Sequence, residues 1–313
     1  DEMDSLKDIW KSWEDPHQGA GLFQSWEWCR MWCSHVLAPE QNLRVAIRVM
    51  EDGNGRAVGI MPLFSRNMLG SVLQVIDFIG YRMSPQNDVL LAEPNNHDLI
   101  QHVAQGLWSS LNWHSFCHLR NLSSESMLCS VLGAQGRIQP QCDRVWVEAD
   151  PKISDPMQRL SKGRRKSLRH ALNALRKEGD VTVKVATIDE FPAAFDELIV
   201  LHKKRFASKN WNTLLCDKKV SFLKYISRKL AQANKAEVLQ LRLNEQTIAS
   251  QLNFVHNGSC IAYQAGFDPN YAKYSPMWQL DIEAIKRSFS DLKCKRHDFG
   301  QGYGNYKYSW HPN

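Results

Sequence analysis

Two segments near the carboxyl end of the chain combine residue types that bind and polarise ligands. In the first, an apolar strand at 259–267 leads through the loop Asp268–Tyr274 into a helix that begins at Ser275 and Pro276. The start of a helix presents free backbone N–H groups and the positive end of the helix dipole, so it suits a phosphate or carboxylate, and Lys273 would add charge. Glycine-rich phosphate signatures are absent, so an ordinary strand–loop–helix unit that binds nothing is the alternative.

The second segment follows the next strand along the chain. Asp298 stands at the end of that strand, and a glycine-rich run then leads to Tyr306 and Lys307. In α/β proteins, ligands bind beyond the carboxyl ends of the strands, and glycines let a ligand approach the backbone closely. The pattern predicts a crevice lined by a carboxylate, a phenol and an ammonium group. A glycine-rich turn with solvated polar side chains is the alternative.

The elements that position these segments recur in the same order in two halves of the chain. In each half, the sequence pattern predicts a hairpin of two strands, a third strand, a helix and a further strand. The ranges are 44–50, 57–64, 72–80, 96–112 and 115–122 in the first half, and 237–243, 247–255, 259–267, 275–290 and 294–299 in the second. We therefore expect an α/β (α+β) protein with two domains, 1–150 and 151–313.

A strongly basic segment lies between the two halves. Residues 159–177 carry eight lysines and arginines and no acid, and Leu168, Leu172 and Leu175 give the segment an apolar stripe at helical spacing. A basic helix of this kind attracts a nucleotide cofactor, RNA or an anionic membrane face. A solvated helix face with no partner is the alternative.

Composition excludes several other classes of protein. The chain has 313 residues, a net charge of +6 and no apolar stretch approaching the roughly 20 residues of a membrane span. Its eight cysteines are scattered without a CxxC pair, which suits a reducing cytoplasm. The pairs Cys29/Cys33 and His114/His118 have the spacing of metal ligands on a helix, but no second pair completes either site. We expect a cytoplasmic protein without a metal or a transmembrane segment.

Several short motifs together resemble a known family. They are Leu201-His202-x-x-Arg205-Phe206, Tyr271-x-x-Tyr274-Ser275-Pro276, Asp298-Phe299-Gly300, Tyr306-Lys307 and, near the start, Phe23-x-Ser25-x-Glu27-Trp28. The set resembles the CelD-like GNAT-type acyltransferases, with a BioF2-like acetyltransferase domain, which are found in bacterial exopolysaccharide and cellulose gene neighbourhoods. That family is related to the Fem peptidoglycan-bridge transferases, which pair two GNAT-like domains. The resemblance covers nearly the whole chain.

The resemblance implies two GNAT-like mixed-sheet domains in tandem, the first degenerate, with the basic helix between them. In the second domain, strands 259–267 and 294–299 would splay apart around the pantetheine arm of an acyl-CoA such as acetyl-CoA. The residues expected to bind this donor are Gln264, Tyr271, Lys273 and Ser275. The chain departs from the family at Met277, where the family usually has glycine, and a bulky side chain there would narrow the approach to the helix end.

Acyl transfer to an amine needs a base for the attacking nitrogen and an acid for the leaving thiolate. Asp298 is the expected base, and Tyr274 and Tyr306, with Tyr271, are candidates for the acid. A small-molecule acceptor would be held by His202, Arg205, Tyr263 and Lys307. His202 could instead be a helix-surface residue, and Arg205 an ordinary salt-bridge partner.

Three functions are consistent with these features. The first is an acyl-CoA-dependent N- or O-acyltransferase acting on a sugar or amino compound, in exopolysaccharide or cell-envelope biosynthesis. The second is a Fem-like transferase that takes its acyl group from aminoacyl-tRNA, with the basic helix on the RNA phosphates. The third is a non-catalytic GNAT-fold scaffold in exopolysaccharide assembly, which Met277 favours.

Overall fold

The computed structural model describes residues 2–14, 21–68, 72–94, 96–124, 126–134, 136–140, 143–302 and 304–311. The chain forms two compact units, Asp1–Gln141 and Cys142–Asn313. The division lies before the boundary expected at 150/151, because the strand β8 (Arg144–Glu148) pairs with a strand of the second unit, β13 (Arg296–Gln301).

The first unit is built from short helices around two small sheets. Its helices are α1 (Glu2–Ser5), α2 (Lys7–Ser12), α3 (Trp26–Trp32), α4 (His97–Ser109) and α5 (Met127–Gly133), with a 3-10 helix at Leu22–Gln24 and a π-helix at Cys33–Leu37. Its strands are β1 (Leu43–Val45), β2 (Arg48–Glu51), β3 (Ala57–Met61), β4 (Leu63–Met68), β5 (Leu73–Phe78), β6 (Leu90–Leu91) and β7 (Ser115–Cys117).

Proline interrupts the sheet of the first unit. Pro62 separates β3 from β4 and has no N–H for a ladder bond, and the hairpin divides there into two sheets, β1-β4-β5-β7 and β2-β3-β6. The strands β5 and β7 are parallel, and α4 connects them. The helix buries Val103, Ala104 and Leu107 against the sheet.

The second unit carries the residues of the predicted site. Its helices are α6 (Lys162–Arg176), α7 (Phe191–Ala207), α8 (Asp217–Gln232), α9 (Pro276–Ser290) and α10 (Asn305–Tyr308), with 3-10 helices at Pro156–Arg159 and Pro269–Tyr274. Its strands are β8, β9 (Val181–Val185), β10 (Ala236–Leu243), β11 (Gln246–His256), β12 (Ser259–Phe267) and β13.

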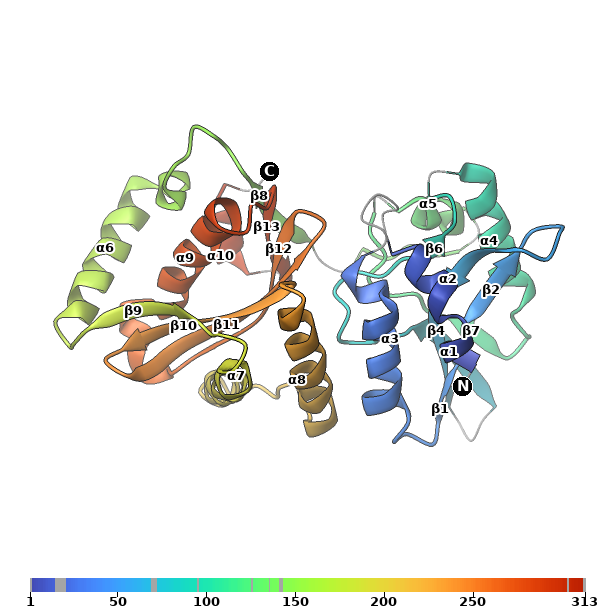
Figure 1. The fold of residues 1–313 in the computed structure, drawn as a ribbon, viewed down its shortest axis with the longest axis horizontal. Coiled ribbons are helices and arrows are strands. Elements are labelled where there is room, and N and C mark those ends of the chain that lie inside the picture. The colour runs from blue at the N-terminus through green and yellow to red at the C-terminus, as the bar shows by residue number, and fades with distance from the viewer. Residues whose placement is uncertain are drawn as a thin grey trace. The chain divides into compact units, whose positions relative to one another are not determined.

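One six-stranded sheet, in the order β8-β13-β12-β11-β10-β9, forms the centre of the second unit. Its strands are antiparallel except β12 and β13, which run parallel and are joined through α9. Helices α7 and α8 lie on one face of the sheet, and α6 and α9 lie on the other (Figure 1). Each face therefore has its own packed layer.

The expected recurrence of elements is confirmed with a difference in the first unit, where the predicted return strand 57–64 is divided at Pro62 into β3 and β4 and the short β6 precedes α4. Strands β2 to β5, α4 and β7 thus stand against β10, β11, β12, α9 and β13. Both series end in a parallel pair joined by a helix. Both units are mixed α/β structures, so the predicted fold class is confirmed as well.

The basic segment forms helix α6, which belongs to the second unit. The helix begins at Lys162, later than the start of the basic run, because the Ser161 hydroxyl caps it by accepting the N–H of Arg164. Leu168, Ala171 and Leu175 are its buried residues, and most of its basic side chains are exposed. Among the helices of the described residues, none has the length and apolar character needed to span a membrane.

Candidate active site

The strands β12 and β13 pair only at their beginnings. Their parallel register joins Ser259 to Arg296, Cys260 to His297 and Ile261 to Asp298, and it ends there although both strands continue. Gly300 lies just past this point with φ +70 and still lies against β12, where a Cβ on it would come within 2.9 Å of the Ala262 carbonyl oxygen. The ladder between the two strands therefore stops before their carboxyl ends, and we call the unpaired stretch beyond it the β12/β13 splay.

Asp298 lies at the start of the splay, but both of its carboxylate oxygens bind groups of the protein. Its side chain is 1% exposed, its Oδ2 forms an ion pair with Arg144 of β8, and its Oδ1 accepts the N–H of Gly300 at 2.7 Å. Burial raises the pKa of Asp298, against the lowering effects of Arg144 and the Gly300 N–H. At 1% exposure, with each oxygen held by a group of the protein, Asp298 is not accessible to a substrate amine, so the expected role as general base does not fit this geometry.

Lys307 is likewise a structural residue rather than a substrate ligand. Its side chain is buried, and its ammonium donates to the carbonyl oxygens of Gly300 at 2.7 Å and Gln301 at 2.8 Å. These bonds fasten α10 to the end of β13. The ammonium still influences its surroundings, since it lowers the pKa of Asp298 and of a second carboxyl, Asp281.

Asp281 is a carboxyl that the sequence reasoning missed. It lies on α9, is 5% exposed, and forms no hydrogen bond or ion pair with a described residue. Burial raises its pKa to about 7, against the opposing charges of Arg205 and Lys307. A signal was available, because Asp281 falls at helical spacing between Trp278 and Ile285, inside the apolar stripe of that helix.

Two of the expected site residues interact electrostatically with Asp281. The guanidinium of Arg205, on α7, lies 5.4 Å from the ring of Phe267 at the end of β12, and its charge lowers the pKa of Asp281. Burial and the charge of Asp281 raise the pKa of Tyr306, and Arg205 partly opposes this. Phe267 ends β12 and Tyr306 follows β13, so the groups that act on Asp281 lie next to the last residue of one strand or after the other.

His202 and Gln264 form a second polar group between α7 and β12. The buried imidazole has Gln264 Nε2 2.6 Å from its Nδ1 and Thr213 Oγ1 2.8 Å from its Nε2. Burial, followed by the charges of Arg205 and Lys203, lowers the pKa of His202. The group can form because Gly266 lets α7 lie directly on the strand, where a Cβ would come within 2.3 Å of the His202 backbone nitrogen.

These contacts change the roles expected for three residues. His202 is a buried residue rather than one on the helix surface. Gln264, which was expected to bind the acyl donor, forms a hydrogen bond with His202 instead. Tyr263 packs its ring 4.9 Å from that of Phe254 within the sheet, and burial raises its pKa.

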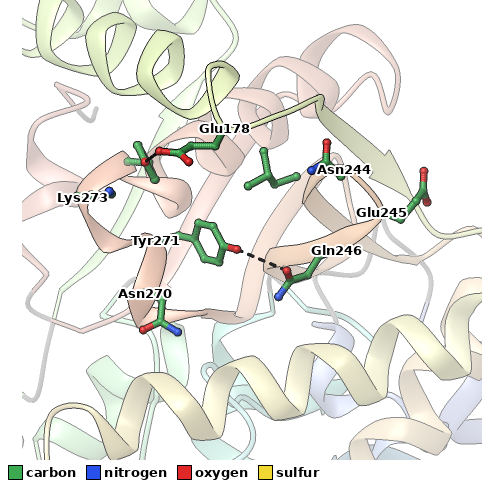
Figure 2. A pocket seen from close by; sticks show the side chains of 9 residues that line it. Glu178, Asn244, Glu245, Gln246, Asn270, Tyr271 and Lys273 are labelled. Carbon is green, nitrogen blue, oxygen red and sulfur yellow. Dashed lines mark hydrogen bonds between the residues drawn. The ribbon is translucent and has the colours of Figure 1, made fainter.

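Three other expected residues line an open pocket beside the segment that follows the carboxyl end of β12. The cavity measures about 780 Å³ and lies beside the 3-10 helix Pro269–Tyr274. Figure 2 shows the phenol of Tyr271 pointing toward Gln246, with Glu178 and Lys273 on the other side of the ring. The hydroxyl of Tyr274 donates to Glu178, so this phenol is occupied and lies away from Asp281.

The start of α9 differs in detail from the expected cap. Ser275 has φ +53, in the left-handed region, and its side chain makes no capping hydrogen bond, while its carbonyl accepts from Trp278 at 3.0 Å. Met277 packs against the core cluster around Tyr274 and Leu280, so part of its side chain is turned into the protein. Met277 therefore narrows the approach of a ligand to the start of α9 less than the sequence suggests.

Comparison with known families identifies this half of the chain. Residues 162–308 match the family model described as an acetyltransferase (GNAT) domain. The second unit contains a GNAT domain. The parallel strands β12 and β13 belong to it, and the match supports an acyltransferase. A search of curated proteins gives no match to the sequence.

Solved structures share the fold of the chain over most of its length. FemX is 10% identical with a TM-score of 0.65, and the match covers 98% of this chain and 93% of FemX. The C-terminal domain (DUF2156) of a putative lysylphosphatidylglycerol synthetase from Agrobacterium fabrum is 13% identical with a TM-score of 0.52, covering 91% and 88% of the two chains. A Bacteroides thetaiotaomicron protein of unknown function is 11% identical with a TM-score of 0.58, covering 98% and 93%. At these low sequence identities the likeness shows a shared fold and nothing more.

Proposed function

We propose that the chain is an acyl-CoA-dependent N-acyltransferase that works in the β12/β13 splay, with Asp281 as the general base. The observation that carries the proposal is a buried carboxyl without a partner among the described residues, at the place where the GNAT strands separate. Natural proteins seldom bury a carboxyl unpaired, because desolvation costs several kcal/mol or forces the group to take up a proton. Such groups concentrate at functional sites.

The residues at the splay are suited to the acyl-bearing arm of the donor. Beyond Ile261 the backbone of β12 has no strand partner on the β13 side, so an extended chain could lie along it. The donor would supply an acyl thioester. Its diphosphate fits less well in the open pocket, where the carboxylates of Glu178 and Glu245 accompany one ammonium, that of Lys273.

Two groups of the protein can then carry out the two proton transfers of amide formation, one as base and one as acid. Asp281, with a pKa of about 7, is half ionised near neutral pH and can take the proton of an attacking amine. Tyr306, whose pKa is raised, stays protonated and can donate toward the leaving sulfur. Arg205 can hold an anionic group of the acceptor. The acceptor is proposed to be a sugar or amino compound, and a role in exopolysaccharide or cell-envelope biosynthesis rests on the motif resemblance alone.

The proposal is tested by thermal shift and turnover with a panel of acyl-CoAs and amine acceptors. A donor at about 100 times its dissociation constant should stabilise the protein by about 2.7 kcal/mol. Release of free thiol should depend on both donor and acceptor. A chain that neither binds any acyl-CoA nor releases thiol would contradict the proposal.

A Fem-like donor is a second candidate, and helix α6 favours it. The exposed basic residues of α6 form a surface that suits RNA phosphates. If the donor is an aminoacyl-tRNA, transfer should proceed with charged tRNA and not with acyl-CoA. The same assay, run with both donors, separates the two.

A further inference from the structure

Three arginines of the first unit surround one tyrosine. The guanidinium carbons of Arg120, Arg82 and Arg66 lie 4.5, 5.1 and 5.6 Å from the centre of the Tyr81 ring. Burial alone would raise the pKa of Tyr81, but hydrogen bonds and charges from these arginines lower it. We call Arg66, Tyr81, Arg82 and Arg120 the arginine cluster.

Only one of the three guanidiniums has an ionic partner among the described residues. Arg120 Nε lies 3.3 Å from Oδ2 of the buried Asp77. Neither Arg66 nor Arg82 forms an ion pair with a residue that the structure describes, and the Nε of Arg66 is buried without a hydrogen bond. The neighbouring His118 adds no negative charge, and burial and the arginines lower its pKa.

The cluster therefore carries an excess of about two positive charges. Asp77 offsets at most one, and its Oδ1 already accepts the N–H groups of Phe78 at 2.8 Å and Arg120 at 3.2 Å. Stacking on an aromatic ring stabilises a guanidinium but does not cancel its charge. Arg66 and Arg120 are half-buried and Arg82 is exposed. Like charges around one ring repel one another, so an anion between them would stabilise the arrangement.

The position of the cluster is one that suits ligands. Tyr81 and Arg82 follow β5, and Arg120 follows β7, the parallel strand beside it. The two strands pair from Gln74 to Ile76 and then diverge, with Asp77 bridging to the backbone of Arg120. Apart from Arg66, which lies in β4, the residues of the cluster follow the carboxyl ends of parallel strands, the usual place for a ligand in an α/β sheet.

We propose that the arginine cluster binds a phosphoryl group, as free phosphate or as part of a larger ligand. Guanidinium groups match phosphate oxygens in a two-pronged geometry. A phosphate or phosphate monoester carries close to two negative charges, which equals the excess, whereas a carboxylate would leave one guanidinium uncompensated. The site is distinct from the splay of the second unit and does not depend on the function proposed there.

The test is calorimetric titration of the full chain with inorganic phosphate, sulfate and acetate at constant ionic strength. We expect saturable binding of phosphate, and binding of acetate weaker than that of phosphate. Arg82→Gln and Arg66→Gln should each weaken phosphate binding by about ten-fold or more. Arg82→Lys, which keeps the charge but loses the planar fork, should lie between Arg82→Gln and the parent.

Arg56→Gln is the matched control, since Arg56 is an exposed arginine in the turn between β2 and β3, outside the cluster. It should leave phosphate binding unchanged. Arg82 is also exposed, so its variants should fold, and melting temperatures measured without phosphate will verify this.

Absence of saturable phosphate binding would overturn the proposal, as would equal weakening by Arg56→Gln, which would indicate only diffuse attraction. Titration with a nucleoside monophosphate, and with vesicles of phosphatidic acid in phosphatidylcholine, separates the sources of the phosphoryl group, since both probes carry a phosphate monoester. Tighter binding of either probe that is lost in Arg82→Gln identifies the larger ligand. Binding that the variants do not affect counts against the site.

Discussion

Arg144 of β8 and Asp298 of β13 form an ion pair in the interior of the second unit. The Asp298 side chain is 1% exposed and the Arg144 side chain 26%. The pair joins the first strand of the unit to the strand that borders the splay, and the Gly300 N–H holds the other carboxylate oxygen. Asp298 thereby fixes the place where β13 turns away from β12.

Asp298→Asn should therefore reduce stability more than chemistry. Loss of a buried, charge-assisted interaction typically costs about 1–3 kcal/mol, and the melting temperature should fall by about 2–4 °C for each kcal/mol. The measurement is thermal and urea unfolding beside Asp189→Asn, an exposed aspartate with no ion pair among the described residues. An unchanged melting temperature combined with lost turnover would return Asp298 to the mechanism.

The contrast between Asp298 and Asp281 shows how far the sequence can lead. Strand and helix periodicity predicted the two α/β halves and the helix 275–290, because those patterns are local. The pairing of β8 with β13 links residues far apart in the chain, and no local pattern reveals it, so Asp298 was interpreted as a free carboxylate. Asp281 was visible in the helical spacing, but only burial without a partner distinguishes it from a solvated acid.

Other residues that were expected in one site lie in different places, again because their positions depend on contacts between distant parts of the chain. The motifs His202-x-x-Arg205 and Tyr271-x-x-Tyr274 are local, but the structure directs their members to different places. Arg205 lies over the ring of Phe267, while Tyr271 and Tyr274 line the open pocket. Which side chain reaches which cavity depends on packing across the sheet.

Asp281 should make stability depend on pH. Its folded pKa of about 7 lies above the ordinary value of 3.8, so its contribution is present at low pH and is lost as the pH rises through about 7. Between pH 5 and pH 8 the parent should lose roughly 3 kcal/mol relative to Asp281→Asn. Urea unfolding of both proteins at the two pH values measures this, and a difference that does not change with pH would show that the carboxyl is not held neutral.

The open pocket can be tested for the donor diphosphate by two opposite substitutions. If the diphosphate lies there, Lys273→Ala should raise the KM for acyl-CoA with little effect on kcat, because it removes a positive charge. Glu245→Gln should lower that KM, because it removes a negative charge from the same pocket. Both effects should shrink as salt is added. If neither substitution changes the KM, the diphosphate binds elsewhere.

Helix α6 offers a direct test of an RNA donor. Replacing the exposed Lys162, Lys166 and Arg169 with glutamine should weaken tRNA binding and reduce the slope of log K against log salt by about one for each phosphate that the helix no longer neutralises. Arg228→Gln with Lys229→Gln, exposed on α8, is the control. A parent that does not bind tRNA, or a triple variant that binds as the parent does, would exclude this donor.

The decisive measurement is the turnover of Asp281→Asn with an acyl-CoA and an amine acceptor across pH 5.5 to 9, beside Asp298→Asn as the structural comparison. A general base contributes about 10²–10⁴-fold, so Asp281→Asn should lose turnover by that factor while remaining folded. The acidic limb of kcat/KM, with an apparent pKa of about 7 in the parent, should be absent in the variant. If Asp281→Asn keeps full turnover and the same pH profile, Asp281 is not the base and the reaction does not depend on the carboxyl at the splay.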